Sequence, residues 1–487
     1  MSQVRTTIKN IISLGASNAI NAVLGIILIM YLARYFGPEG FGIYGFAYAF
    51  AQILSFSVEF GIYYIIIRDV ARDKSRAMEY IWSASIIKIP LMIIVFIFIV
   101  GIVKLMNISP EKEILIYIIS FSLFLTHFSQ TFRGIFNAFE KMEYTALTTI
   151  IPSIIFVLLS LWVIFSEYTL FESKIIPIAL ALVFTGIINV LLSAFICFKK
   201  LVKFNLRVKI NLKFLKYLLK ESFPLELQII IALIYIQSFI IFLSVYSGDA
   251  ATGIFKASHG LIVQLIAIPA LTAFALYPIM SKLFVTSEND LKMIIKKATK
   301  FLFIICFFIT IIGFVFADKI IIFVYGADYL ESVLIFQILI FAFLIHGTFY
   351  VVSYSILAIN RQKYQTINAF ITCVFAIVLN FLLIPIYGVI GVAISMLLSF
   401  ICNNLIYIYF SNRYVLKIKI SEIRNLIKPF MLIIVIGIVT IATFFYLLNF
   451  NLFIAGVAST VFYFVSVHFT KIISNEDIEI MKSMIKK

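Results

Sequence analysis

The stretch GPEGFGIYGF, residues 37–46, lies between two long apolar runs, and a second version of it, GDAATGIFKA, occupies residues 248–257 in the same setting. The matching positions are Gly37 with Gly248, Gly42 with Gly253, Ile43 with Ile254 and Tyr44 with Phe255. A match of this kind between two apolar segments indicates an internal repeat of membrane helices. The two copies differ conspicuously at one position, where Lys256 replaces Gly45.

The composition points to a membrane protein. Hydrophobic residues make up 63% of the 487-residue chain and charged residues only 13%, whereas soluble proteins carry about 25% charged residues. Apolar runs of about 20 residues are long enough to cross a bilayer core as helices. We therefore expect an all-α, polytopic integral membrane protein whose first apolar run is a retained span and not a signal peptide. Fourteen spans are predicted, at 11–35, 41–67, 80–104, 114–137, 145–165, 175–198, 223–247, 252–278, 301–317, 333–357, 366–384, 388–410, 429–448 and 452–470.

The positive charge of the chain follows this predicted topology. The formal net charge is +16, and with the N-terminus inside, most Lys and Arg fall in the loops expected on the inner side. This asymmetry is typical of the positive-inside rule and predicts both termini in the cytoplasm, with the chain in the cytoplasmic membrane. A nucleic-acid-binding protein would gather its charge in one folded domain, so no nucleic-acid partner is expected.

The repeat predicts two lobes. Residues 134–164 and 355–384 each leave one span, cross a short polar loop and enter the next. We expect parallel six-helix lobes at 1–198 and 223–410 around a central cleft, followed by two additional spans and a cytoplasmic tail at 411–487. Two such lobes can rock about the cleft, which favours an alternating-access transporter.

A basic segment, residues 199–222, joins the predicted lobes. It contains eight Lys and Arg and no acid before Glu221. The residues that share one helical face are Leu212, Leu215, Leu218 and Leu219, with Lys213, Lys216 and Lys220 elsewhere. This pattern predicts an amphipathic cytoplasmic helix on the inner leaflet, held by anionic membrane lipids. A plain linker and a helix that binds a calmodulin-like partner are the alternatives.

Ionisable residues inside apolar runs are the candidates for a functional site, because a charge in the hydrocarbon layer costs a few kcal/mol or more. The candidate cleft charges are Arg34, Glu59, Lys88, Lys256 and His259, with Arg133 as a secondary candidate. Glu59 and Glu226 are candidates for binding a coupling ion, H⁺ or Na⁺. No metal site or other cofactor is predicted, because the four cysteines have no CxxC spacing and no nearby His.

Each candidate also has a structural explanation. Arg34 and Lys256 can extend to the outer headgroups, and Arg133 can extend inward or cap a helix. Glu59 can pair with Lys88 as a structural contact. His127 and His346 are expected to serve in packing or hydrogen bonding.

The candidate cations outnumber the acids, so a cleft lined by them would attract anions such as phosphate or pyrophosphate. On this hypothesis Lys256 replaces Gly45 because the cleft needs a cation there. The chain has no GxxxxGK[ST], HExxH, GxSxG or strand-associated GxGxxG motif, so we do not expect an enzyme.

Three segments resemble one known family. ARYFGPEGFGIY (33–44), the run from EFG (59–61) to IRDVARDK (67–74), and NFLLIPIYGVIGVAISMLLS (380–399) are similar to segments of polysaccharide-transport (O-antigen, lipid-linked oligosaccharide) flippases of the multidrug/oligosaccharidyl-lipid/polysaccharide exporter superfamily. The resemblance implies translocation of polyprenyl-(pyro)phosphate-linked oligosaccharide from the inner to the outer face for surface glycan synthesis, with glycan-assembly enzymes as candidate partners. It implies that the cavity charges are Arg34, Glu59, Lys88 and Lys256.

Three other functions are weighed against this one. The peptidoglycan-precursor flippases carry arginines inside their first helix, where this chain offers only Asn18 and Asn21, so that cargo is disfavoured. A cation-coupled multidrug exporter of the same superfamily would depend on Glu59 or Glu226. A non-transporting membrane assembly protein would tolerate neutral replacements of Arg34, Lys88 and Lys256.

Overall fold

The computed structural model describes residues 2–166, 173–205, 211–418, 420–448 and 452–470, and within these ranges the protein is helical with no β-strand. The packing of the helices divides the chain into two compact units. The first unit comprises Met1–Ala257, Val324–Tyr329 and Ile377–Val392, and the second comprises Ser258–Phe323, Leu330–Ala376 and Ala393–Lys487. The division into the lobes 1–198 and 223–410 stays a prediction.

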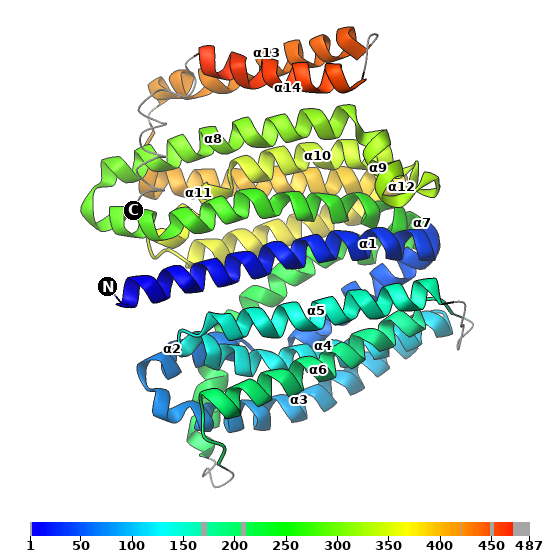
Figure 1. Ribbon diagram of the computed structural model, residues 1–487, viewed down its shortest axis with the longest axis vertical. Helices are drawn as coiled ribbons and strands as arrows, with labels where there is room; N and C mark the ends of the chain where they lie inside the picture. Colours follow the sequence, from blue (N-terminus) through cyan, green and yellow to red (C-terminus); the bar gives the residue numbers. More distant parts are fainter. Residues whose placement is uncertain (1, 167–172, 206–210, 419, 449–451, 471–487) are drawn as a thin grey trace. The chain divides into compact units, whose positions relative to one another are not determined.

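The first unit is a helical bundle. Its complete helices are α1 (Ser2–Phe56), α2 (Ile62–Arg72), the short η1 (Lys74–Arg76), α3 (Ala77–Met106), α4 (Pro110–Ala138), α5 (Met142–Phe165) and α6 (Ile176–Lys200). The unit also holds the first part of α7 (Leu212–Thr286), the last residues of α9 (Ala317–Tyr325), η2 (Ala327–Tyr329) and the middle of α12 (Lys363–Ser411). Helix α4 packs against α1, α3 and α6, and α5 packs against α1 and α6, so α3 to α6 lie side by side (Figure 1).

The second unit contains the rest of α7 and α12 and the C-terminal helices. These are α8 (Glu288–Val315), α10 (Ser332–Thr348), α11 (Tyr350–Ala358), the π-helical η3 (Asn412–Leu416), α13 (Ile420–Leu448) and α14 (Leu452–Phe469). Helix α8 packs against α10, α11 and α13, and α13 packs against α14. Aromatic rings fill the contact between α8 and the last two helices, where Phe303 meets Phe430 and Phe308 meets Tyr463.

Three of the long helices are bent at a glycine. Gly37 in α1 (φ 67°, ψ 177°) and Gly248 in α7 (φ 84°, ψ −176°) have almost the same backbone conformation. Gly388 in α12 has φ 53° and ψ −126°. Positive φ is accessible to glycine at little cost and breaks a right-handed helix, so each of these helices has two arms. The matching conformations of Gly37 and Gly248 agree with the repeat predicted from the sequence.

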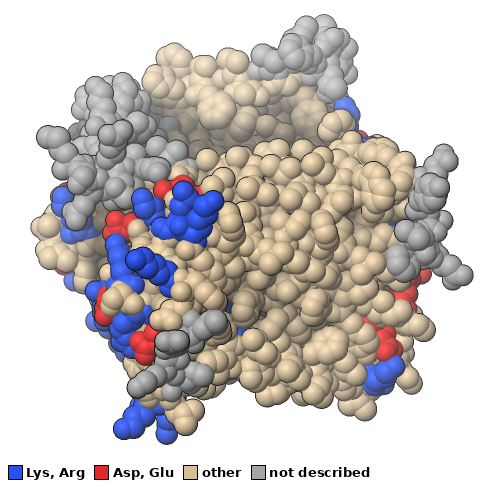
Figure 2. Space-filling view, turned by 60° about the horizontal axis from the view of Figure 1, so that its bottom comes forward, with Lys and Arg blue, Asp and Glu red and all other residues tan. Residues whose placement is uncertain are grey.

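The described part of the chain contains ten helices long and apolar enough to cross a membrane. The bent α1, α7 and α12 can each supply two spans, and α14 is a shorter apolar helix, so the arrangement is compatible with fourteen predicted spans. Large apolar side chains lie on the outside, among them Ile97, Phe98, Leu158 and Trp162. On the face shown in Figure 2, the charged side chains gather toward its two edges and leave an uncharged surface between them. The protein is therefore a multi-pass membrane protein, as predicted.

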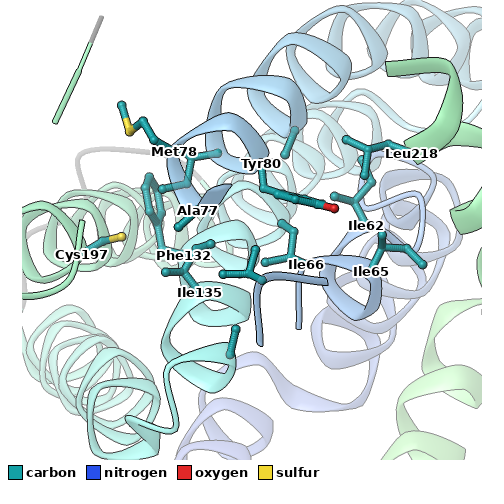
Figure 3. Close-up of a cluster of buried hydrophobic side chains, with 14 of the residues drawn as sticks. Ile62, Ile65, Ile66, Ala77, Met78, Tyr80, Phe132, Ile135, Cys197 and Leu218 are labelled. Carbon is teal, nitrogen blue, oxygen red and sulfur yellow. The ribbon is translucent and has the colours of Figure 1, made fainter. Parts of the chain in front are cut away.

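One hydrophobic cluster joins α2, α3, α4 and α6 to the start of α7 (Figure 3). Tyr80, Phe132 and Ile135 are buried there beside Phe214 and Leu218 from the basic segment that joins the predicted lobes. Leu215 and Leu219 also pack against this cluster, whereas Leu212 is exposed. The apolar face expected to lie on the inner leaflet therefore packs largely on the protein itself, since α2 and α3 offer it an apolar surface. The lysines at 213, 216 and 220 remain exposed.

Candidate functional site

Glu59 and Lys88 form a buried ion pair in the first unit. Glu59 lies in the turn that separates α1 from α2, and Lys88 lies on α3. The Lys88 Nζ is 2.7 Å from the Glu59 Oε2, and the two side chains are 0% and 1% exposed. The structural pairing expected for these residues is therefore found.

Both partners of this pair are satisfied. The Lys88 ammonium also donates to the His127 carbonyl oxygen at 2.8 Å and to the Thr131 hydroxyl at 3.0 Å. The Glu59 Oε1 accepts a hydrogen bond of 3.0 Å from the Tyr63 backbone N–H. An ammonium group has three protons to donate, and here all three have acceptors. Lys88 is thus held as a structural cation in this state.

Glu226, on α7, approaches the same cluster. Its side chain is 2% exposed, and within the described part of the chain neither carboxyl oxygen has a hydrogen-bond partner. It interacts electrostatically with Glu59, with the backbone N–H of Gly61 and with Lys88. The backbone of α7 can approach Gly61 (φ +66°) closely because glycine has no Cβ. A Cβ at this position would lie only 2.7 Å from the Ser222 carbonyl oxygen. A buried carboxyl of this kind is suited to hold a proton or a small cation.

The repeated stretches 37–46 and 248–257, with the helix arms on either side of their kink glycines, form two repeated hairpins that pack against each other through glycines. A Cβ on Gly42 would lie 1.8 Å from the Asp249 carbonyl oxygen, and a Cβ on Gly253 would lie 1.8 Å from the Pro38 carbonyl oxygen. Pro38 and Asp249 occupy equivalent places, each following the kink glycine. The contact is therefore reciprocal, and it requires glycine on both sides.

Lys256 breaks this symmetry. Its Nζ lies 4.7 Å from the centroid of the Phe41 ring and 4.5 Å from that of Tyr44, within the range of cation–π attraction. A Cβ on Gly45 would lie 2.7 Å from the Lys256 Cδ, so Gly45 leaves the space that the lysine side chain fills. Gly45 and Lys256, which occupy equivalent positions in the two repeats, are therefore neighbours in the structure, and the small residue makes room for the large one.

The remaining candidates are scattered. Arg34 is exposed near the kink of α1, and its Nε donates to the Val324 carbonyl oxygen at 3.0 Å. His259 is half-buried one turn after Lys256 and belongs to the second unit. Within the first unit, the structure brings Glu59, Lys88 and Glu226 together, but it places Arg34 and Lys256 in separate surroundings of their own. The roles predicted for all these residues in binding stay predictions.

Arg133, on α4, lines an open cavity of about 420 Å³ in the first unit. Its Nη2 is 3.5 Å from the Thr148 carbonyl oxygen, and its Nε has no partner among the described residues. Thr148 lies within α5 and not at a helix end, so this contact is not a helix cap, and the roles considered for Arg133 stay predictions. Its neighbours in the cavity, among them Asn21, Thr126 and Thr149, are missing from the predicted site because single hydroxyl and amide side chains in apolar helices give no distinctive sequence signal.

Histidine and cysteine take packing positions. His127 stands edge-on to Phe56 at 5.0 Å, and His346 stacks on Phe400 at 4.5 Å, as expected for packing residues. Among the described residues, no group of three or more His, Cys, Asp and Glu is placed to hold a metal ion. The prediction that the protein has no cofactor remains untested.

The bent, apolar helices define a multi-pass membrane fold, and solved structures of other proteins share it. The solved structure of a lipid II flippase, MurJ, in an inward closed conformation covers 94% of this chain and 98% of its own with a TM-score of 0.73 and 18% identity. An inward-facing multidrug resistance MATE family transporter of the MOP superfamily covers 82% of this chain and 94% of its own, with a TM-score of 0.60 and 16% identity. At these identities the likeness establishes the fold.

The family follows from the sequence comparison. The family described as "Polysaccharide biosynthesis protein" matches residues 7–284, which is more than half of the chain, and the chain belongs to this family. A curated relative from Shigella flexneri, an O-antigen transporter by name, is 24% identical over 405 residues, which cover 80% of this chain and 93% of the relative. The predicted resemblance to polysaccharide-transport proteins is thus confirmed, and the curated relatives carry the name of transporters, as expected for this chain.

Proposed function

We propose that the protein translocates a polyprenyl-(pyro)phosphate-linked oligosaccharide from the inner to the outer face of the cytoplasmic membrane. The observation that carries this proposal is membership of the polysaccharide biosynthesis family together with O-antigen transporter relatives that align over most of their length. The flippase-like fold supports it. Alternating access of two lobes is the proposed mechanism.

The cations near the repeated hairpins support an anionic cargo. Lys256 is held over the rings of Phe41 and Tyr44, and Arg34 is exposed near the equivalent kink. Both are suited to attract the phosphate groups of a lipid-linked sugar. The acids Glu59 and Glu226, by contrast, gather around Lys88.

A strain that lacks this protein tests the proposal. We expect loss of surface glycan and accumulation of lipid-linked oligosaccharide on the inner side, with recovery on expression of the wild-type chain. Lys256→Ala and Arg34→Ala should each reduce recovery at normal membrane levels, and Arg361→Gln, on an arginine of the second unit, is the matched control. Unchanged glycan in the deletion strain, after other flippases have been removed, would refute the proposal.

Glu226 favours a second candidate, a cation-coupled multidrug exporter. A buried carboxyl without a hydrogen-bond partner among the described residues is a natural site for a coupling proton or Na⁺. The second candidate predicts efflux of hydrophobic cations such as ethidium from whole cells, and loss of that efflux in Glu226→Gln. If cells with the wild-type protein retain as much ethidium as the deletion strain, this second candidate is excluded.

A further inference from the structure

The cavity at Arg133 is a polar cavity of the first unit that the sequence pattern does not predict. It lies among α1, α4, α5 and α6, and its volume of about 420 Å³ falls in the range of small-molecule sites, about 300–1,000 Å³. The polar residues that line it are Asn21, Ser122, Thr126, Arg133, Thr149, Ser153, Thr185 and Asn189. Arg133 is the one charged residue in this lining.

Three hydroxyl groups of the lining donate their single proton to the backbone of their own helix. Thr126 donates its proton to the Ser122 carbonyl oxygen at 3.2 Å, Ser153 to the Thr149 carbonyl oxygen at 2.8 Å, and Thr185 to the Ala181 carbonyl oxygen at 3.0 Å. A hydroxyl that has given its single proton to its own helix still has lone pairs to accept hydrogen bonds. These three oxygens can therefore accept hydrogen bonds from a ligand that carries donor groups.

Asn21 adds an acceptor of the same kind. Its amide nitrogen donates to the Ser17 carbonyl oxygen at 2.9 Å, and its buried Oδ1 has no donor among the described residues. Burying an acceptor without a donor is unfavourable, so a ligand hydroxyl that donates to the Asn21 Oδ1 stabilises the complex.

Arg133, by contrast, offers a hydrogen-bond donor to a ligand. Its Nε has no acceptor among the described residues, and its contact with the Thr148 carbonyl oxygen is long at 3.5 Å. Glu59 acts on it electrostatically but is already paired with Lys88 at 2.7 Å. A guanidinium with open N–H groups prefers a carboxylate or a phosphate, and its charge repels a metal cation.

From these requirements we infer that the cavity binds an anionic group attached to a hydroxyl-bearing ring, that is, a sugar phosphate or an acidic sugar. Arg133 takes the phosphate or carboxylate, and the Ser, Thr and Asn acceptors take the sugar hydroxyls. This inference rests on the proposed function and assigns it a binding site for the glycan end of the cargo. The phosphate at the lipid linkage and an acidic unit of the glycan are the two sources of this chemistry.

Isothermal titration of the purified full-length protein in detergent tests the site with four probes: glucose 1-phosphate, glucuronate, methyl glucoside and inorganic phosphate. We expect one of the two charged sugars to bind at least about tenfold more tightly than both methyl glucoside and inorganic phosphate. Preference for glucose 1-phosphate points to the lipid-linkage phosphate, and preference for glucuronate to an acidic sugar unit. Equal binding of methyl glucoside, or no binding of either charged sugar, would overturn the inference.

Substitutions at Arg133 and at Thr126 separate the parts of the site. Arg133→Gln should weaken the charged sugars at least about tenfold, with Arg133→Lys intermediate and Arg361→Gln unchanged. Thr126→Val keeps the side-chain shape and should weaken the binding of the preferred sugar without changing the binding of inorganic phosphate. This variant still tests the site if Arg133→Gln fails to fold. Unchanged sugar binding in a folded Arg133→Gln protein overturns the site. The glycan assay on the deletion strain judges the proposed function separately, so the site can fail while the function stands.

Discussion

At Lys88, three acceptors surround an ammonium group that has three protons to donate, and the Glu59 carboxylate among them lies 2.7 Å away. Both side chains are almost completely buried. In such a place each charge depends on the other, because a lone ion would lack both water and a counter-charge. The pair therefore stabilises the junction of α3 with the turn after α1.

We expect Lys88→Met to lower the free energy of unfolding by about 3–5 kcal/mol, because it leaves Glu59 buried and unpaired. The double variant Lys88→Met/Glu59→Leu should recover much of this loss. Thermal unfolding of the purified protein in detergent, followed by intrinsic fluorescence, measures both. The single variant Glu59→Leu completes the comparison. If the losses of the two single variants simply add in the double variant, the pair is not coupled and the explanation is wrong.

Glu226 has a different character, since it is buried without a hydrogen-bond partner among the described residues. If it carries the coupling ion, Glu226→Gln should abolish the dependence of transport on an imposed pH or Na⁺ gradient. Reconstituted vesicles with a labelled lipid-linked sugar measure this dependence. Glu331→Gln, on an exposed acid, is the control, and full gradient dependence in Glu226→Gln would remove this residue from the coupling step.

At the scale of the elements, the glycine contact between the arms of α1 and α7 admits no side chain on either helix. A Cβ at 1.8 Å from a backbone oxygen cannot be accommodated by rotating a flexible side chain. The helices must move apart or bend. The contact therefore fixes how closely the two repeated hairpins approach.

Gly42→Ala should accordingly destabilise the protein by about 1–3 kcal/mol or more, as overpacking does. Gly101→Ala on α3 is the matched control, because its Cβ would meet nothing within 4 Å. Alanine favours a helix over glycine by about 1 kcal/mol, so this control should be neutral or slightly stabilised. The melting temperatures of the two variants give the comparison, and equal values would contradict the packing argument.

The end of α2 is attached to the start of α7 by a second group of contacts. Arg68 contacts Glu221 at 3.1 Å and Tyr217 at 2.9 Å, and Asp69 accepts hydrogen bonds of 2.9 Å from Tyr217 and from Tyr80. Burial alone would raise the pKa of Asp69, but the hydrogen bonds from Arg68, Tyr217 and Tyr80 outweigh it and hold this pKa below its ordinary value. The carboxylate form is thus favoured in the folded protein.

A depressed pKa means that Asp69 stabilises the fold fully above its unfolded pKa of about 3.9. This contribution is lost as the pH falls through the lower, folded value. We expect the difference in melting temperature between wild type and Asp69→Asn to be constant near neutral pH and to shrink below about pH 4. A difference that grows as the pH falls would contradict the assignment.

For the whole molecule, the distribution of Lys and Arg predicts that both termini lie in the cytoplasm. A fluorescent-protein fusion at the C-terminus should be bright, and an alkaline phosphatase fusion at the same place should be inactive. A phosphatase fusion in the loop between α3 and α4, near Asn107, should be active because this loop is expected outside. The reverse pattern would invert the predicted topology.

Much of the fold is predictable because the relevant forces are local. An apolar run of about 20 residues spans the bilayer wherever it occurs, and a glycine can take positive φ whatever surrounds it. The repeated hairpins at Gly37 and Gly248 could thus be found from matching glycine, isoleucine and aromatic positions in the sequence. The basic segment shows the limit, because the pattern of Leu215 and Leu219 predicts an apolar face but does not say whether lipid or α2 and α3 will cover it.

By itself, the sequence determined the class of protein, its membrane helices, its family resemblance and the short set of charges that required an explanation. Only the tertiary structure decided which of those charges are paired. Lys88 meets Glu59 and the carbonyl of His127 across three separate segments, and Arg133 shares a cavity with side chains from α1, α5 and α6. Pairing and enclosure depend on which helix faces pack together, and no helix carries that information in its own residues.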